Sequence, residues 1–145
     1  MHKLVHKLCT SEGKLSMEIK RLIENGVEIF YNGMAMGFDL LAAETVLRYQ
    51  KQYPHVRLIA CIPCYNQEKN FPETDKQRYA KILKRATSMV MLSENYYRGC
   101  MQVRDQYMVD NADMVLCYCI KDTGGAAYTV KYCQKKYPFK PILEI

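Results

Sequence analysis

The 145-residue sequence contains no apolar run of about eighteen residues, the length that a membrane-spanning helix needs. Its first thirteen residues also lack the continuous apolar stretch of a secretory signal, because lysines and histidines interrupt them. Hydrophobic residues make up 49% of the chain and charged residues 25%, a balance that excludes wholesale disorder and fibrous repeats. We therefore expect a cytoplasmic globular protein that does not contact the membrane.

The cysteines do not have the arrangement of a disulfide framework or a zinc site. There are seven, an odd number, and the spacings Cys61-x-x-Cys64 and Cys117-x-Cys119 do not supply two C-x-x-C pairs in tight turns. Cys61, Cys117 and Cys119 fall in expected strands, where such close neighbours cannot surround one metal ion. We expect reduced, packed cysteines and no metal, with metal or redox use as the alternative. Cys64 and Cys100, in expected loops, are the candidates for reactive thiols.

No block of charge of one sign interrupts the sequence. Lys and Arg total 21 against 15 Asp and Glu, and the resulting net charge of +6 is spread along the chain. This excess favours an anionic ligand. It is also common in proteins that bind no nucleic acid, so charge alone does not identify a partner.

Apolar periodicity and Gly/Pro punctuation divide the chain into alternating helices and strands. Leu15, Ile19 and Leu22 form a helical stripe that ends at Gly26, and Pro54 ends a second helix. Alternating elements of this length predict right-handed strand–helix–strand units and a parallel sheet covered on both faces. Helices are expected at residues 15–25, 38–53, 75–86, 101–111 and 126–137, and strands at 27–31, 56–62, 88–92, 114–120 and 141–145.

Residues 31–39 join an expected strand to a helix and contain two glycines four positions apart. Gly33 and Gly37 allow a tight backbone turn and close approach of a phosphate, which the helix N-terminus would attract. Met34 lies between them, and Asp39 follows. The alternative is a tight turn in which Asp39 caps the helix.

A second loop, residues 122–129, has the same position after a strand and before a helix. It contains Thr123, Gly124, Gly125 and Thr129. Ligands of parallel sheets bind beyond the carboxyl ends of strands, so the two loops together can hold two ends of one nucleotide. The chain has neither the dinucleotide-binding G-x-G-x-x-G pattern nor a Walker A loop.

Other polar residues near these loops are secondary candidates. The long connection that contains Gln67 and Arg78 suggests a lid, and Arg104 follows a tyrosine-rich loop suited to stacking on a base. A solvated face with packed tyrosines is the alternative for that loop. Glu44 faces the pocket or forms a salt bridge with Arg48 one turn away. No group has an evident partner for catalysis, and Glu44 is the sole catalytic candidate.

The ordered motifs resemble the YpsA-like proteins of the SLOG superfamily. They are Asn32-Gly-Met-Ala-Met-Gly-Phe-Asp-Leu-Leu-Ala-Ala-Glu44, Ile62-Pro63 with Gln67 and Arg78-Tyr79, Leu92-Ser93 with Tyr96-Tyr97, Arg104-Asp105 through Asp113, and Gly124-Gly125 with Tyr128-Thr129. The resemblance covers about residues 15–145 and implies a three-layer, Rossmann-like α/β fold with a mostly parallel sheet. It also implies a pocket for a nucleotide or nucleotide-derived ligand, lined by the two glycine loops, with Arg78 and Arg104 approaching from the side.

Two departures from the superfamily pattern affect this interpretation. Members usually begin with a strand that ends in a Thr-Gly-His-Arg-like turn, whereas residues 1–13 here are atypical and have no such turn. Either residues 4–9 replace that central strand or the sheet lacks it. In both cases we expect residues 14–145 to form a single domain. The LOG enzymes, which cleave cytokinin ribotides, carry a catalytic Glu where this chain has Lys131, which argues against the same hydrolysis.

We therefore expect a non-catalytic sensor or regulatory protein that binds a nucleotide-like small molecule and holds no cofactor. One alternative is hydrolysis of an N-glycosidic bond, with Glu44 and Asp39 near the pocket. Others are single-stranded DNA binding of the kind known in the superfamily member DprA, and scaffolding through protein contacts. An exposed sheet edge left by a missing strand would favour a homo-oligomer.

Overall fold

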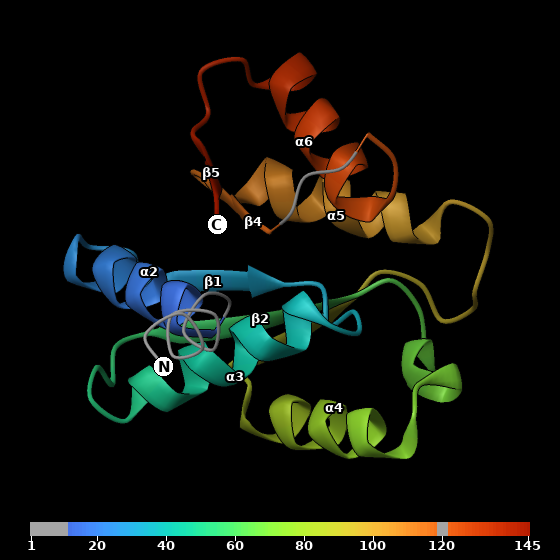
Figure 1. Ribbon diagram of the computed structural model, residues 1–145. Coiled ribbons are helices and arrows are strands. Elements are labelled where there is room, and N and C mark those ends of the chain that lie inside the picture. Colours follow the sequence, from blue (N-terminus) through green and yellow to red (C-terminus); the bar gives the residue numbers. More distant parts are fainter. Residues whose placement is uncertain (1–11, 119–121) are drawn as a thin grey trace, which may run out of the picture.

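The computed structural model describes residues 12–118 and 122–145, and strands and helices alternate along most of this length (Figure 1). The expected type of each element is confirmed, and most boundaries differ by one to three residues from the sequence-based ranges. In chain order the elements are α2 (Glu12–Glu24), β1 (Ile29–Asn32), α3 (Phe38–Gln50), β2 (Arg57–Ile62), η1 (Gln67–Asn70), α4 (Glu73–Arg85), β3 (Ser88–Met91), α5 (Cys100–Asn111), β4 (Val115–Cys117), α6 (Gly125–Lys136) and β5 (Ile142–Glu144).

The described strands form two parallel sheets. Strands β1, β2 and β3 are neighbours in that order, with Phe30 opposite Leu58 and Ala60 opposite Met89. Strands β4 and β5 pair separately, with Leu116 opposite Leu143. The α/β class and the parallel pairing expected from the sequence are thus confirmed. The expected strand at residues 4–9 lies outside the described residues.

The helices form layers on either side of the strands. Helix α3 packs against both α2 and α4, and α5 packs against α6 (Figure 1). The larger core lies between the first of these layers and strands β1 and β2, where burial of apolar surface supplies most of the stabilising free energy. Its buried residues include Leu15, Ile19, Leu40, Ala43, Val46, Leu47, Val56, Leu58, Ala60, Ile62, Tyr79 and Ile82.

Cys64 lies in a loop as expected, but Cys100 does not, and both of these candidate reactive thiols are buried. Cys64 retains 3% exposure, and Cys100 begins helix α5 with 1% exposure. Burial raises the pKa of the Cys64 thiol, because the charged thiolate is disfavoured away from water. Cys61 and Cys117 lie in strands as expected and are buried and unpaired. These cysteines behave as packed apolar side chains. Cys9 and Cys119 lie outside the described residues.

Strand β4 is shorter than the sequence suggested. It covers Val115–Cys117, whereas the apolar run predicted residues 114–120, and residues 119–121 lie outside the described part of the chain. Helix α3 ends at Gln50, before Pro54 would require it to end. Among the described residues, no helix is both long and apolar enough to span a bilayer.

Candidate functional site

A cavity of about 340 Å³ lies between β1 and β4. Helices α2, α3 and α5 contribute residues to its lining, and so does the start of α6. The cavity brings together residues of both glycine loops, which follow β1 of one sheet and β4 of the other. Five of the candidates singled out in the sequence line it: Gly33, Asp39, Arg104, Gly125 and Thr129.

The first glycine loop is held by its own polar side chains. The Asn32 side chain donates a hydrogen bond to the Asp39 carbonyl at 2.7 Å and accepts one from the Met34 amide at 2.8 Å. The Asp39 carboxylate accepts a hydrogen bond from the Ala35 amide at 3.2 Å. Gly37 is the N-cap of α3 and provides no side-chain cap. Asp39 therefore stabilises the loop before the helix, rather than capping the helix itself.

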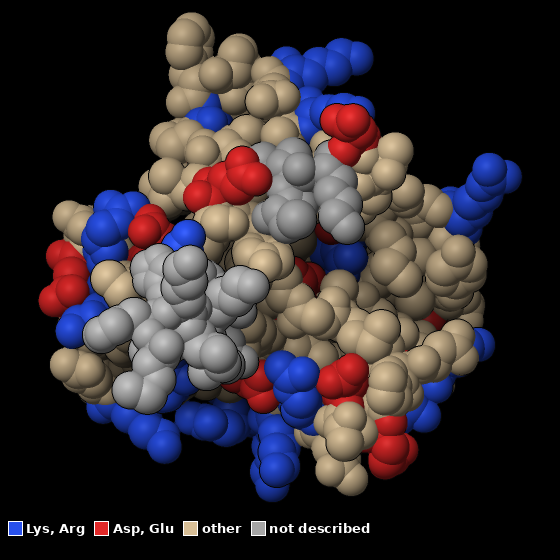
Figure 2. All heavy atoms as spheres, in the orientation of Figure 1, with Lys and Arg blue, Asp and Glu red and all other residues tan. Residues whose placement is uncertain are grey.

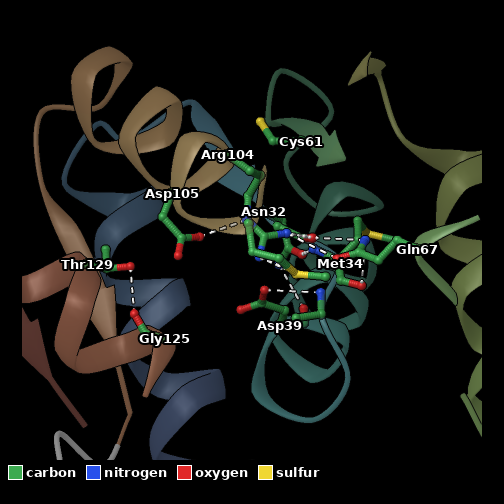
Figure 3. A network of polar contacts seen from close by, with 12 residues as sticks. Asn32, Met34, Asp39, Cys61, Gln67, Arg104, Asp105, Gly125 and Thr129 are labelled. Atoms are coloured by element: carbon green, nitrogen blue, oxygen red, sulfur yellow. Dashed lines mark hydrogen bonds and ion pairs between the residues drawn. The ribbon is translucent and has the colours of Figure 1, made fainter. Parts of the chain in front are cut away.

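Arg104 crosses from α5 to this loop and is 5% exposed. Its guanidinium donates to the Gly33 carbonyl at 2.5 Å and to Gln67 Oε1 at 3.2 Å, and its Nε donates to Asp105 at 2.7 Å (Figure 3). A Cβ on residue 33 would lie 2.9 Å from an Arg104 nitrogen. A side chain at residue 33 would therefore require the Arg104 guanidinium to shift, because this guanidinium packs directly against the backbone.

The Arg104 guanidinium binds Asp105 directly and interacts electrostatically with Asp39, and both carboxylates line the cavity. Burial raises the pKa of Asp39, and Arg104 and the Ala35 amide only partly offset that rise. Burial likewise raises the pKa of Asp105, with Arg104 and Thr129 acting in the opposite direction. The physical cause is the same in both cases: the charged form loses hydration that a single cation does not replace.

The second glycine loop presents the N-terminus of α6 to the cavity. Gly124 is its N-cap with φ of 102°, and no side-chain cap hydrogen bond is made there. Gly125 and Thr129 line the cavity, and the Thr129 hydroxyl donates to the Gly125 carbonyl at 2.9 Å. First-turn amides and the helix dipole together favour an anion at such an end. Thr123 lies in the exposed turn before the helix.

Two candidates, Gln67 and Met34, support the loop from outside the cavity lining. The Gln67 side chain is 3.4 Å from both the Gly33 and Met34 carbonyls and also meets Arg104 (Figure 3). Met34 is fully buried, with φ of 59°. Both residues fix the position of the loop backbone.

Arg78 and Glu44 lie elsewhere. Arg78 binds Glu44 at 2.5 Å and Asp75 at 3.1 Å, and all three side chains are partly exposed. Neither Arg78 nor Glu44 is among the residues that line the cavity. Of the two alternatives considered for Glu44, a pocket role and a salt bridge with Arg48, the structure shows neither, because Glu44 pairs with Arg78.

Sequence reasoning missed several residues of the site. Asp105, Asn32, Phe38 and Tyr118 all line the cavity, and the rings of Phe38 and Tyr118 stack at 5.7 Å with an 11° interplanar angle. Asn32 and Asp105 lie inside the motifs given above, next to Gly33 and Arg104 in the sequence. Their position beside two candidate residues could therefore have identified them. No local pattern connects Phe38 with Tyr118, because only the fold brings them together.

The arrangement combines donors and acceptors at the carboxyl ends of β1 and β4. Amides at the start of α6 suit an anionic group, while Asp39 and Asp105 suit hydroxyl or amino groups. In the described ranges, no cluster of three or more His, Cys, Asp or Glu residues is placed to hold a metal ion. The cavity is chemically suited to a polar organic molecule that carries an anionic end.

Comparison with known proteins agrees with the motif pattern. The model of the YpsA family, described as the YspA SLOG family, matches residues 7–141. A UPF0398 protein of Halalkalibacterium halodurans is 30% identical over 127 residues, which are 86% of this chain and 67% of that protein. A UPF0398 protein of Brevibacillus brevis is 30% identical over 125 residues, covering 84% of this chain and 66% of that protein.

The UPF0398 protein YpsA of Bacillus subtilis is 27% identical over 117 residues, which are 79% of this chain and 65% of that protein. The chain therefore spans about two thirds of the length of these curated relatives.

Proposed function

Because the chain belongs to the YpsA family of SLOG proteins, we propose that it binds a nucleotide or nucleotide-derived ligand in the cavity between β1 and β4, without catalysing a reaction on it. The observation that carries this proposal is the meeting of the two glycine loops. Gly33 and Asp39 of the first loop and Gly125 and Thr129 of the second line one cavity. Two loops that follow strands on either side of one cavity suit a ligand with two chemically different ends.

The charges of the site suggest how such a ligand would lie. A phosphate would sit at the N-terminus of α6, where amides and the helix dipole favour negative charge. Asp39 and Asp105 would repel a phosphate but accept hydrogen bonds from ribose hydroxyls or an amino group. The half-buried Phe38 and the more exposed Tyr118 offer aromatic surface for a base. Opposite ends of the site therefore favour different parts of a nucleotide.

Thermal-shift and calorimetric titration with nucleoside monophosphates, NAD and ADP-ribose test the proposal. A ligand present at about one hundred times its Kd stabilises the folded state by about 2.7 kcal/mol, which is a clear rise in Tm. Inorganic phosphate and ribose, added separately, show whether either end of the ligand is sufficient.

Gly125→Val is the informative variant. A Cβ at residue 125 would meet no atom within 4 Å, and its φ is not in the left-handed region, so the fold tolerates a side chain there. That side chain would extend toward the space assigned to the phosphate and should weaken binding at least about tenfold. The matched control is Gln134→Ala, an exposed position on the same helix. The proposal is wrong if no compound in the panel binds, or if Gly125→Val binds as tightly as the control.

Hydrolysis of a nucleotide N-glycosidic bond is a second candidate, and the state of Asp39 favours it. A cavity carboxyl group whose pKa is raised can stay protonated and donate to a leaving base. Chromatographic detection of free base after incubation with nucleoside monophosphates would reveal this activity. If base is released, Asp39→Asn should abolish its release and Glu44→Gln should not, because Glu44 pairs with Arg78 outside the cavity lining.

Binding of single-stranded DNA receives less support from the charge distribution. On the face in Figure 2, Lys and Arg side chains are interspersed with Asp and Glu side chains. A single-strand binder typically carries a basic groove with aromatic platforms. Oligonucleotide binding that weakens steeply with salt would nevertheless favour this alternative over a small-molecule ligand.

A further inference from the structure

Strand β3 is an edge strand with two exposed apolar side chains. It ends the sheet β1-β2-β3, and in the described part of the chain only β2 pairs with it. Met89 is 52% exposed and Met91 is 41% exposed. An apolar strand at an unpaired sheet edge is a typical place for another chain to associate.

The two methionines belong to the core side of the sheet. The register places Met89 beside Ala60 and Met91 beside Ile62, and these two residues of β2 are buried in the larger core. Neighbours in register direct their side chains to the same face of a sheet. Helix α4 packs against α3 on that face but does not pack closely against β3. The helical layer therefore stops before the edge, and the methionines extend beyond it.

The edge also lacks the features by which natural edge strands prevent pairing. Such strands usually carry a charged side chain, a proline or a bulge. Residues 88–91 are Ser-Met-Val-Met, with no charge and no proline, and they pair with β2 in continuous register. Another strand could therefore add to β3 through backbone hydrogen bonds without burying a charge.

The charges that flank β3 favour a second copy of the chain as the source of that strand. The exposed Lys84 and Arg85 end α4 just before β3, and the exposed Glu94 is the first charged residue after it. A two-fold interface must be complementary to itself. Antiparallel pairing of two β3 strands would bring the basic end of each copy to the acidic end of the other, whereas parallel pairing would align like charges.

We propose that β3 is a homodimer interface, in which it pairs antiparallel with β3 of a second copy across a two-fold axis. Opposite residues of an antiparallel pair point to the same face, so the axis passes through a residue position. An axis at Val90 sets Met89 of each copy opposite Met91 of the other. The two three-stranded sheets would become one continuous sheet, with the methionines between the two α4 helices. Unbranched methionine side chains adapt well to such a space.

This interface is separate from the proposed ligand site. No residue of β3 lines the cavity between β1 and β4, so the dimer does not depend on the identity of the ligand or on its binding. The dimer also does not require that a strand be missing from the sheet.

Sedimentation equilibrium of the full-length chain, with light scattering as a second measurement, tests the proposal. The parent protein should dimerise reversibly. Met89→Lys combined with Met91→Lys would place like charges opposite each other and remove the apolar contact, so the dimer Kd should rise at least about 100-fold. Met89→Lys combined with Met91→Glu would instead place opposite charges together in this register. It should dimerise at least about tenfold more tightly than the double lysine variant.

The matched control is Met17→Lys, which changes a 73% exposed methionine on α2 and should leave the dimer Kd unchanged. Far-ultraviolet circular dichroism shows that each variant is folded. The proposal is supported if the double lysine variant loses the dimer while Met17→Lys keeps it. A parent chain that is monomeric at about 100 μM would overturn it. So would a dimer that survives in the double lysine variant, because another surface would then join the copies. Equal Kd values for the two double variants would overturn the antiparallel register.

Discussion

Arg104 and Arg78 each interact with two carboxylates, and the two clusters differ in their exposure to solvent. Arg104 is almost fully buried, binds Asp105 directly and is electrostatically coupled to Asp39. Arg78 binds Glu44 and Asp75 with its side chain 35% exposed and that of Glu44 39% exposed. Water can replace any partner in the second cluster but not in the first. Similar ion pairs therefore have different energetic consequences once solvent is removed.

The largest expected effect is that of replacing Arg104. Arg104→Met would leave Asp105 and the Gly33 carbonyl without their common donor and Asp39 without a nearby cation, and removing one partner of a buried pair costs about 3–5 kcal/mol. Urea unfolding should show this loss, with Arg78→Met as the control. A loss below about 1 kcal/mol for Arg104→Met would mean that burial does not distinguish the two clusters.

Alkylation of Cys61 should report the same difference in stability between the Arg104→Met and Arg78→Met variants. Burial raises the pKa of this thiol to about 11, so only about 0.1% is thiolate at pH 8. Iodoacetamide should react with Cys61 in the parent protein only through rare opening, and mass spectrometry can follow the reaction. A cost of about 3 kcal/mol in Arg104→Met should raise the labelling rate about 100-fold, whereas Arg78→Met should leave the rate almost unchanged. Equal rates in the two variants would contradict the comparison.

Asp39→Asn should stabilise the protein at neutral pH. The pKa of Asp39 is raised in the folded state, so the folded state favours the protonated carboxyl, and that contribution is lost as pH rises above the unfolded value near 4. Asparagine cannot ionise, so the variant should gain on the order of 1 kcal/mol at pH 7.

Melting temperatures of parent and variant between pH 4 and pH 8 measure this difference. The gain should shrink as pH falls, because the parent carboxyl then becomes neutral as well. Asp75→Asn, which removes a carboxylate from the exposed cluster, should show no such gain. A gain that is constant with pH would contradict the assignment to ionisation of Asp39.

Arg78→Gln should have the smallest effect. Ion pairs with this degree of exposure contribute about 0–1 kcal/mol, and salt screens them. The difference in unfolding free energy from the parent should be measured at low and high ionic strength, and it should diminish with added salt. A large loss that does not respond to salt would indicate that Arg78 acts as a buried group like Arg104.

Much of the fold was predictable from local patterns. The stripe of Leu15, Ile19 and Leu22 predicts α2, and the run at residues 56–62 predicts a buried strand, because helical and extended chains present side chains at different periods. The two glycine loops were correctly placed between strands and helices. Their order along the chain was sufficient to predict a parallel arrangement.

The partners of individual polar side chains could not be predicted in the same way. Arg78 and Arg104 were both expected to approach the pocket from the side, but only Arg104 lines it. Glu44 was considered with Arg48 because they share a helix face, yet it pairs with Arg78, 34 residues away. The burial of Cys64 also depends on distant segments that no local window contains.

The types of the elements, their order and the chain positions of the glycine loops could be inferred from local sequence patterns, because they follow from side-chain periodicity and backbone preferences. The packing of distant segments, by contrast, is what places Asp39, Arg104, Asp105 and Thr129 around one cavity between β1 and β4. It also decided which arginine is buried, since burial depends on the packing of segments that are far apart in the chain. The electrostatic effects at the site follow from that burial, which cannot be inferred from local sequence patterns.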